Sequence, residues 1–396
     1  MAKTAQGKTL GRRGFMKAAG AGTLILGARS ALGAAANETL ELGITGCGGR
    51  GPWIGNLFEQ HTATKVVALH DPFQDRVDQA GERLGVPENR RFTGLDGYQG
   101  LIDSGVDAIA IISPPYFHPE QTVAALDAGK HVFIAKPIAV DVPGCTTITD
   151  AARKHADTLC TWVDFQTRKD PFYIEAIRRM HAGQIGQPVF GQSYYHARRL
   201  RVRMEPGTEE ARLRNWVFDI ALSGDIIVEQ NIHVLDVANW MLQEHPVRAF
   251  GTGGRKARTD VGDCWDHFVV TFWYPGDVII DFSSGQFVHA FEDLCTRVHC
   301  TTGSIDTHYG GEVVLEGVSE VYRPGATTGI YQDGAVANIK EFHAAIASGT
   351  PINNADESSR STLTCILGRM AAYQERTITW DEMLEANEKL DANLAL

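Results

Sequence analysis

The stretch ELGITGCGGRG, residues 41–51, decides the fold of the first half of the chain. The apolar run over 40–45 predicts a strand, and a helix is expected over 51–60. Three glycines between them have the G-x-G-x-x-G spacing, which allows a tight turn, a backbone close to a pyrophosphate, and close packing of helix on strand. The stretch therefore predicts a dinucleotide site on five residues: Gly46, Gly48, Gly49, Arg50 and Gly51.

Asp71 follows the second expected strand, residues 65–70. A carboxylate at this place accepts hydrogen bonds from the ribose hydroxyls and repels a 2′-phosphate, so we expect NAD rather than NADP. Arg76 is the nearby cation that could accept such a phosphate. The alternative for Asp71 is a cap on the following helix.

Strands and helices alternate along the first part of the chain, with further strands expected over 107–113 and 131–134 and helices over 74–84 and 119–128. This order predicts a doubly wound parallel sheet. Later in the chain, apolar and polar residues alternate with a period of two. Residues 267–287 indicate two strands around a turn at 275–277, and residues 312–323 show a similar pattern. The fold class expected is α/β plus α+β, with a Rossmann domain and a second domain built on an open, mainly antiparallel sheet.

Three segments are expected from these patterns. Residues 1–36 contain Arg12-Arg13-Gly14-Phe15-Met16-Lys17, an apolar run over 18–28, and small residues up to Ala36. This order resembles a twin-arginine signal peptide, whose route carries folded proteins, although a disordered basic tail is the alternative. We expect a periplasmic or secreted protein without a membrane anchor, because the run is too short to span a bilayer. Residues 37–160 would form the Rossmann domain and 161–396 the substrate and oligomerisation domain, with the C-terminal helices at the junction.

Composition excludes some classes of partner. The chain has a net charge of −11, and its first 36 residues hold six basic residues and no acidic one, so the remainder is more acidic still. This balance does not support binding to nucleic acid or to an anionic membrane. The 7 cysteines are scattered without a C-x-x-C pair, which favours buried, reduced thiols over a zinc knuckle or a disulfide framework.

Five further stretches carry a resemblance to the Gfo/Idh/MocA family of glucose-fructose oxidoreductases and inositol dehydrogenases: 107–137, 164–173, 214–225, 232–240 and 376–384. The likeness covers nearly the whole chain after residue 36. It implies a nicotinamide held between the two domains, a small carbohydrate substrate, and a homo-oligomer, either a dimer or a tetramer. It also implies further cofactor-binding residues: Ser113, Pro115, His118, Lys136 and Gln166.

Two motifs depart from the family pattern. Family members usually have Glu-Lys-Pro where this chain has Ala135-Lys136-Pro137. They also tend to have D-x-G-x-H where this chain has Glu229, Asn231 and His233.

The resemblance makes Lys136, His233 and Glu229 the candidate catalytic residues. Removing hydride from a carbinol needs a base for the hydroxyl proton and a cation for the developing alkoxide. His233 suits the first task and Lys136 the second, or Lys136 holds the nicotinamide ribose. Glu229 lies four residues before His233, so on one helix it would orient the imidazole, unless the helix begins only after Asn231.

A metal at His118, Glu229, His233 and Asp236 is the competing reading of these side chains. We expect no metal there, because the chain lacks short His-x-x-x-His spacing and a lysine is a poor neighbour for a cation.

The function expected is oxidation of a sugar or polyol CH–OH group by an exported enzyme with tightly held NAD. The first alternative is an NAD-dependent glycosidase that works by oxidation, elimination and reduction. The second is a non-catalytic sugar-binding relative, supported only by the absence of Glu at position 135.

Overall fold

The computed structural model describes residues 39–394. The predicted signal peptide, 1–36, lies outside these residues. Among the helices described, none is both long and apolar enough to cross a membrane.

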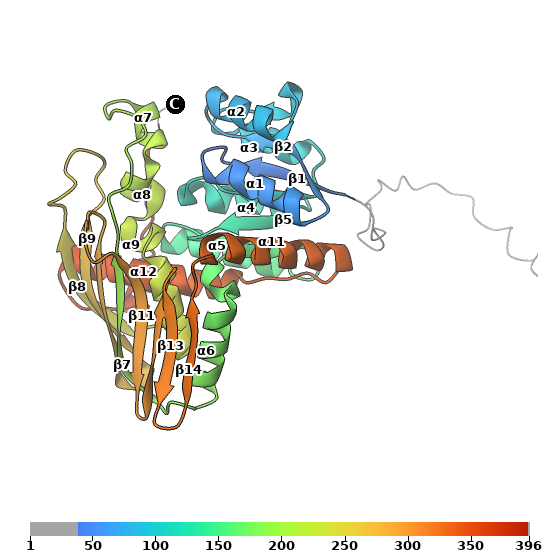
Figure 1. Ribbon diagram of the computed structural model, residues 1–396. Helices are drawn as coiled ribbons and strands as arrows, with labels where there is room; N and C mark the ends of the chain where they lie inside the picture. Colours follow the sequence, from blue (N-terminus) through green and yellow to red (C-terminus); the bar gives the residue numbers. More distant parts are fainter. Residues whose placement is uncertain (1–38, 395–396) are drawn as a thin grey trace, which may run out of the picture. The chain divides into compact units, whose positions relative to one another are not determined.

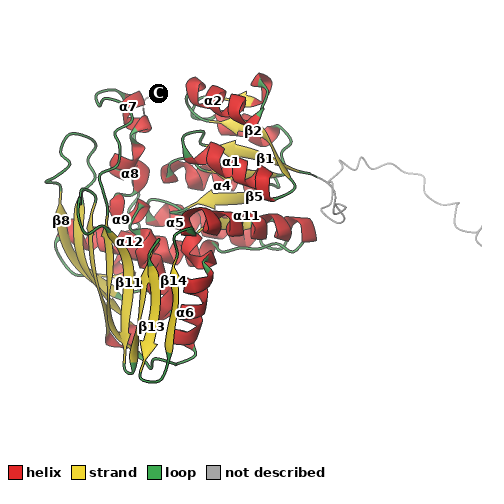
Figure 2. Ribbon diagram, in the orientation of Figure 1, coloured by secondary structure: helices red, strands yellow, loops and turns green. Residues whose placement is uncertain are grey.

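The first sheet has six parallel strands in the order β3-β2-β1-β4-β5-β6 (Figures 1 and 2). Its central strands are buried on both sides, which explains their continuous apolar sequences. The strands are β1 (Leu40–Thr45), β2 (Thr64–His70), β3 (Arg91–Phe92), β4 (Ala108–Ile111), β5 (His131–Ala135) and β6 (Thr161–Asp164). The helices between them are α1 (Arg50–His61), α2 (Gln74–Leu84), α3 (Gly97–Asp103), α4 (His118–Asp127) and α5 (Val142–Lys154). The predicted Rossmann topology is confirmed.

This sheet continues past the boundary expected at residue 160. Strand β6 (Thr161–Asp164) pairs with β5, so the parallel sheet extends four residues into the segment assigned to the second domain. The apolar core of the first domain also includes side chains from α11 (Ile330–Ser348), among them Ile339 and Phe342. Residues far apart in the sequence therefore complete one core.

The second sheet has nine strands in the order β14-β13-β12-β11-β7-β10-β9-β8-β15. All neighbours are antiparallel except β7 and β10, so the expected open, mainly antiparallel sheet is confirmed. The hairpin predicted within 267–287 is β9 and β10, joined at 275–277. The strands are β7 (Pro188–His196), β8 (Arg248–Gly254), β9 (His267–Tyr274), β10 (Val278–Gly285), β11 (Asp293–Cys300), β12 (Gly303–His308), β13 (Glu312–Gly317), β14 (Val321–Ala326) and β15 (Ile378–Thr379).

Three helices pack on one face of this sheet: α6 (Pro171–His181), α10 (Ile232–Leu242) and α12 (Ala355–Gln374). Helix α6 begins where Asp170 caps the N–H groups of Phe172 and Tyr173, with proline at its first position. The remaining helices are α7 (Glu209–Arg214), α8 (Ile220–Ser223), α9 (Ile226–Glu229) and α13 (Trp380–Ala386).

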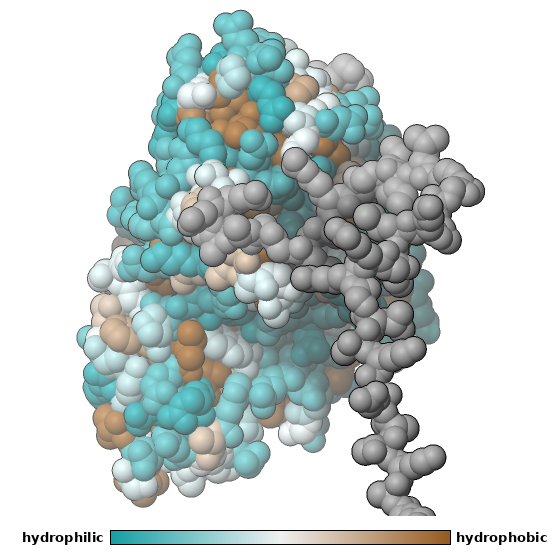
Figure 3. All heavy atoms as spheres, turned by 90° about the vertical axis from the view of Figure 1, so that its right-hand side faces the viewer, coloured by the Kyte–Doolittle hydropathy of each residue, from teal (hydrophilic) through white to brown (hydrophobic). Residues whose placement is uncertain are grey.

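The surface carries hydrophilic side chains over most of the face shown in Figure 3, and apolar side chains form separate patches. This distribution agrees with the acidic composition of the chain.

Candidate active site

The glycine-rich turn has the shape that its sequence predicts. Gly46 has φ +89°, and a Cβ there would lie 2.5 Å from backbone atoms of Ile112. A Cβ on Gly51 would lie 1.9 Å from the carbonyl oxygen of Gly46. Gly48 and Gly49 instead face open space, with no atom within 4 Å of a Cβ. The turn is therefore closed against the protein on one side and open on the other, as an approaching pyrophosphate requires.

Asp71 lies at the end of β2 with only 2% of its surface exposed. Its carboxylate accepts the Cys47 N–H at 2.8 Å and the Phe73 N–H at 3.1 Å, so it holds the glycine turn as well as the start of α2. Arg76 approaches this carboxylate to 3.7 Å. Burial raises the pKa of Asp71, and the charge of Arg76 opposes that shift.

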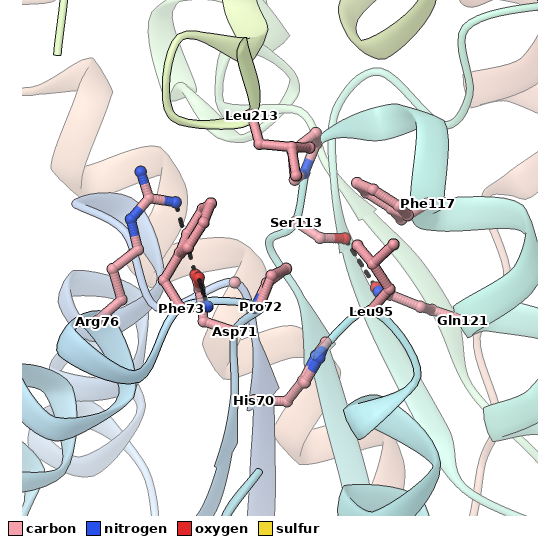
Figure 4. A pocket seen from close by; sticks show the side chains of 12 residues that line it. His70, Asp71, Pro72, Phe73, Arg76, Leu95, Ser113, Phe117, Gln121 and Leu213 are labelled. Carbon is pink, nitrogen blue, oxygen red and sulfur yellow. Dashed lines mark hydrogen bonds and ion pairs between the residues drawn. The ribbon is translucent and has the colours of Figure 1, made fainter. Parts of the chain in front are cut away.

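A pocket opens beside Asp71 (Figure 4). Its walls come from the ends of the parallel strands, the side of the sheet where dinucleotides bind in this fold. The lining side chains include Phe73, Ser113, Phe117 and Leu213. An acid beside an apolar slot fits the ribose and adenine of a dinucleotide, so this chain's residues suit NAD.

Helix α7 reaches this pocket from the second half of the chain. Leu213 lines the pocket, and Arg214 donates to both carboxylate oxygens of Asp75 on α2, at 2.7 and 3.1 Å. The Arg214 guanidinium also lies 4.1 Å from the centroid of the Phe73 ring. The end of the chain lies by α7 in Figure 1, and Ala392 is buried in the same cluster as Leu213. We call α7 and these contacts the clasp, because together they cover one wall of the pocket.

Lys136 follows β5 and is held by Glu229, at the end of α9. Its ammonium donates to the Glu229 backbone oxygen and to the Glu229 carboxylate, the latter at 3.1 Å. Both side chains are largely buried, with 14% and 13% exposed. Family members usually have Glu directly before this lysine, whereas residue 135 here is alanine. Glu229 instead supplies the carboxylate that bonds Lys136.

His233 lies at the start of α10 and packs on Tyr309, with ring centroids 5.5 Å apart. Its Nδ1 is buried without a hydrogen-bond partner among residues 39–394. Burial lowers the pKa of His233 well below its usual value, and the charges of Lys136 and Arg50 lower it further. The imidazole is therefore neutral at pH 7 and can accept a proton.

The expected orientation of His233 by Glu229 is wrong. Helix α9 ends at Glu229 and α10 begins at Ile232, so the two side chains do not share one continuous helix face. The Glu229 carboxylate bonds Lys136 instead. The chain breaks the helix here, and the carboxylate positions the cation rather than the base.

Hydrogen bonds link the surroundings of His233 to the glycine turn. The Tyr309 hydroxyl donates to Gln166 at 2.8 Å, and the Gln166 amide donates to the Tyr331 carbonyl at 2.8 Å. Arg50 donates to the Tyr331 hydroxyl at 3.0 Å and forms an ion pair with Asp164 at 2.5 Å. Arg50 and Gln166 therefore lie in one hydrogen-bond network. Within it, Gln166 positions the Tyr309 ring against His233.

Of the remaining residues predicted to bind the cofactor, some line the pocket and others do not. Ser113 lines the pocket and donates to Gln121 at 2.7 Å. Pro115 is buried and does not line the pocket, whereas its neighbours Pro114 and Phe117 do. His118 is fully buried, with ring nitrogens 2.9 Å from the Ser113 oxygen and 3.0 Å from the Pro137 oxygen, so it ties two turns together. Burial lowers the pKa of His118 to about 4.

The competing set of metal ligands is not free to bind an ion. Asp236 receives two hydrogen bonds from Arg168, both at 2.9 Å, and Glu229 is held by Lys136. His118 lies between two carbonyl oxygens, so three of the four side chains, all except His233, are held by other partners.

Sequence reasoning missed Tyr309, Asp164 and the clasp residues Leu213 and Arg214. Tyr309 follows a strand whose neighbours give no catalytic pattern, and α7 is a short, charged helix. Asp164 and Arg214 begin the stretches 164–173 and 214–225, which carry the family resemblance, so that resemblance could have pointed to both.

A parallel sheet with an open glycine turn, followed by a second domain built on an open sheet, defines a dinucleotide-binding Rossmann protein. The chain belongs to the Gfo/Idh/MocA family: residues 40–163 match the oxidoreductase family model with an NAD-binding Rossmann fold, and residues 173–306 match the C-terminal domain model. The cofactor is therefore NAD.

Individual relatives agree with the family assignment. The chain is 28% identical over 198 residues to scyllo-inositol 2-dehydrogenase (NAD(+)) of Bacillus subtilis, covering 50% of this chain and 52% of the relative. It spans about half the length of the curated relatives it matches. Aldose-aldose oxidoreductase from Caulobacter crescentus has a similar fold, with TM-score 0.71, 20% identity, and 86% and 100% of the two chains covered. Myo-inositol 2-dehydrogenase from Lactobacillus plantarum has TM-score 0.69 and 22% identity, with 86% and 99% covered.

Proposed function

We propose that this protein is an NAD-dependent dehydrogenase of a sugar or polyol CH–OH group. The observation that carries the proposal is the pairing of a carboxylate-held ammonium, Lys136, with a neutral, half-buried imidazole, His233. Lys136 holds the substrate oxygen and stabilises negative charge as it develops. His233 takes the hydroxyl proton. NAD, when bound, would supply the hydride acceptor. The names of the relatives above favour dehydrogenation over the glycosidase alternative.

The experiment uses purified protein and a panel of inositols, aldoses and aryl glycosides. Formation of NADH with a polyol or sugar supports the proposal, whereas phenol release without net NADH would favour the glycosidase. Lys136→Met should lower kcat by about 10²- to 10⁴-fold, while Lys154→Met, at a surface pair with Asp127, should not. Equal activity in both variants would refute the assignment.

We also infer that the protein is exported with NAD already bound. The support is the twin-arginine pattern in residues 1–36 together with the clasp over the pocket. Outside the cytoplasm no free nucleotide is supplied, so the cofactor must be held and recycled in each cycle. Fractionation of cells that express the full chain tests export, and the nucleotide content of the exported fraction tests loading. A cytoplasmic protein, or one that leaves without nucleotide, would contradict the inference.

We infer further that two copies associate through the outer face of the second sheet, which α6, α10 and α12 leave uncovered. This face carries exposed apolar side chains from four adjacent strands: Phe190 at 45%, Phe250 at 44%, Val269 at 49% and Ile279 at 37%. Such a patch is typical of a protein interface. Light scattering should give a dimer or tetramer, and Val269→Lys should give smaller species. A monomeric parent protein would refute this.

A further inference from the structure

The outer face of the second sheet gathers a cysteine, a histidine and two aspartates on β11 and β12. Cys295 lies directly opposite His308, and Arg297 lies opposite Asp306. Ligand atoms of Asp293, Cys295 and His308 all lie within 4.8 Å of one another. The intervening Thr296 faces the other way, donating to the Val234 carbonyl on α10. The cluster is thus separate from the Lys136 and His233 site.

Two distances in this cluster match the separations of metal ligands. The Asp306 Oδ1 lies 3.3 Å from the Cys295 Sγ and 3.3 Å from the His308 Nε2. Tetrahedral Zn²⁺, with bonds of about 2.0–2.3 Å, places its ligand atoms about 3.3–3.7 Å apart. A thiolate, an imidazole and a carboxylate are all ligands that Zn²⁺ accepts.

The neighbouring contacts orient these ligands. The other imidazole nitrogen of His308, Nδ1, lies 2.7 Å from the Asp293 carboxylate, which is the arrangement that fixes a metal-bound histidine. Arg297 donates to the Oδ2 of Asp306 at 2.8 Å, so Oδ1 is the oxygen that faces Cys295 and His308. Once Cys295 and His308 have each given up a proton, the thiolate, the two carboxylates and the Arg297 guanidinium together carry two negative charges, which a divalent cation neutralises.

We propose that Cys295, His308 and Asp306 bind a divalent metal ion of the Zn²⁺ class, with Asp293 as the positioning residue and the fourth coordination position open. The binding step replaces the thiol proton of Cys295 and the Nε2 proton of His308, and both protons leave to solvent. The sequence gives no motif for this site, because the ligands lie on two strands and meet only through the register of the sheet.

The test uses untagged, reduced, full-length protein freed of metal by a chelator and titrated with Co²⁺ and then with Zn²⁺. We expect one metal ion per chain, with a thiolate-to-Co²⁺ absorption band that Zn²⁺ removes. Cys295→Ser should remove the band, and the matched control Cys300→Ser, on the same strand, should retain it. Asp293→Asn should weaken binding by about 10- to 100-fold.

Asp306→Asn keeps the test decisive if Cys295→Ser folds poorly, since it removes one ligand and leaves the thiol in place. Loss of stoichiometric binding in a folded Asp306→Asn protein supports the site. Absence of metal binding in the parent protein, or a band that persists in Cys295→Ser, would overturn the proposal.

Discussion

The clasp over the nucleotide pocket can be tested by replacing Arg214 with methionine. The substitution keeps most of the apolar stem and removes the guanidinium that contacts Asp75 and Phe73. An ion pair with one half-exposed partner contributes about 0.2–1 kcal/mol, and a cation over an aromatic ring about 0.5–1 kcal/mol. The closed clasp should therefore lose about 1–2 kcal/mol, which is about 5- to 30-fold in its population relative to the open state.

Release of bound NADH measures this loss, because Leu213 on the same helix lines the pocket. Stopped-flow displacement of NADH by excess NAD, followed by fluorescence, should give a rate about 5- to 30-fold higher for Arg214→Met. Arg198→Met is the matched control, since it removes a surface ion pair with Glu292 outside the pocket lining. Adding Asp75→Asn to Arg214→Met should change the rate little further. An Arg214→Met rate within twofold of the parent would refute the role of the clasp.

Three further outcomes are expected. Activity, measured as kcat/KM, should fall on the acid side only below pH 6.5. Burial and the charges of Lys136 and Arg50 lower the pKa of His233, and its base form is lost only as the pH falls through that pKa. A fall in kcat/KM at or above pH 7 would contradict this. Phe342→Ala should lower the free energy of unfolding in urea by about 3–5 kcal/mol, while the exposed Val318→Ala should change it by less than about 0.5 kcal/mol; equal effects would be inconsistent with a core role for α11. Asp71→Ser should weaken NAD binding and strengthen NADP binding, so that the Kd for NADP divided by the Kd for NAD falls by at least about tenfold. An unchanged ratio would mean that Asp71 only supports the glycine turn.

The sequence predicts the parts of this fold that depend on local pattern. Glycine spacing at 46–51 indicates the turn, because only certain residues fit a positive φ and a close helix contact. The alternation in 267–287 predicts β9 and β10, since a sheet with one buried face requires a period of two. Both features depend on residues close together in the chain.

Features that depend on tertiary contacts were not predictable in the same way. A spacing of four between Glu229 and His233 is compatible with one helix, but the chain breaks between them and the carboxylate pairs with Lys136, 93 positions earlier. The boundary expected at residue 160 divides the first sheet, because β6 has no local signal of which sheet it joins. Arg214 begins the family stretch 214–225, but nothing local in the sequence shows that its guanidinium contacts Asp75 and Phe73.

The place of α11 has a consequence for how the protein is made. The first domain is synthesised early, but Phe342 of α11 lies in its core against Phe58 and Phe133, with ring centroids 6.2 and 5.5 Å apart. A nascent chain that has left the ribosome only as far as the second sheet would therefore lack part of that core. Completion of the nucleotide-binding domain must wait for almost the entire chain. Cofactor loading is then a post-translational event, and a ribosome-bound fragment that ends before residue 330 should bind NAD poorly.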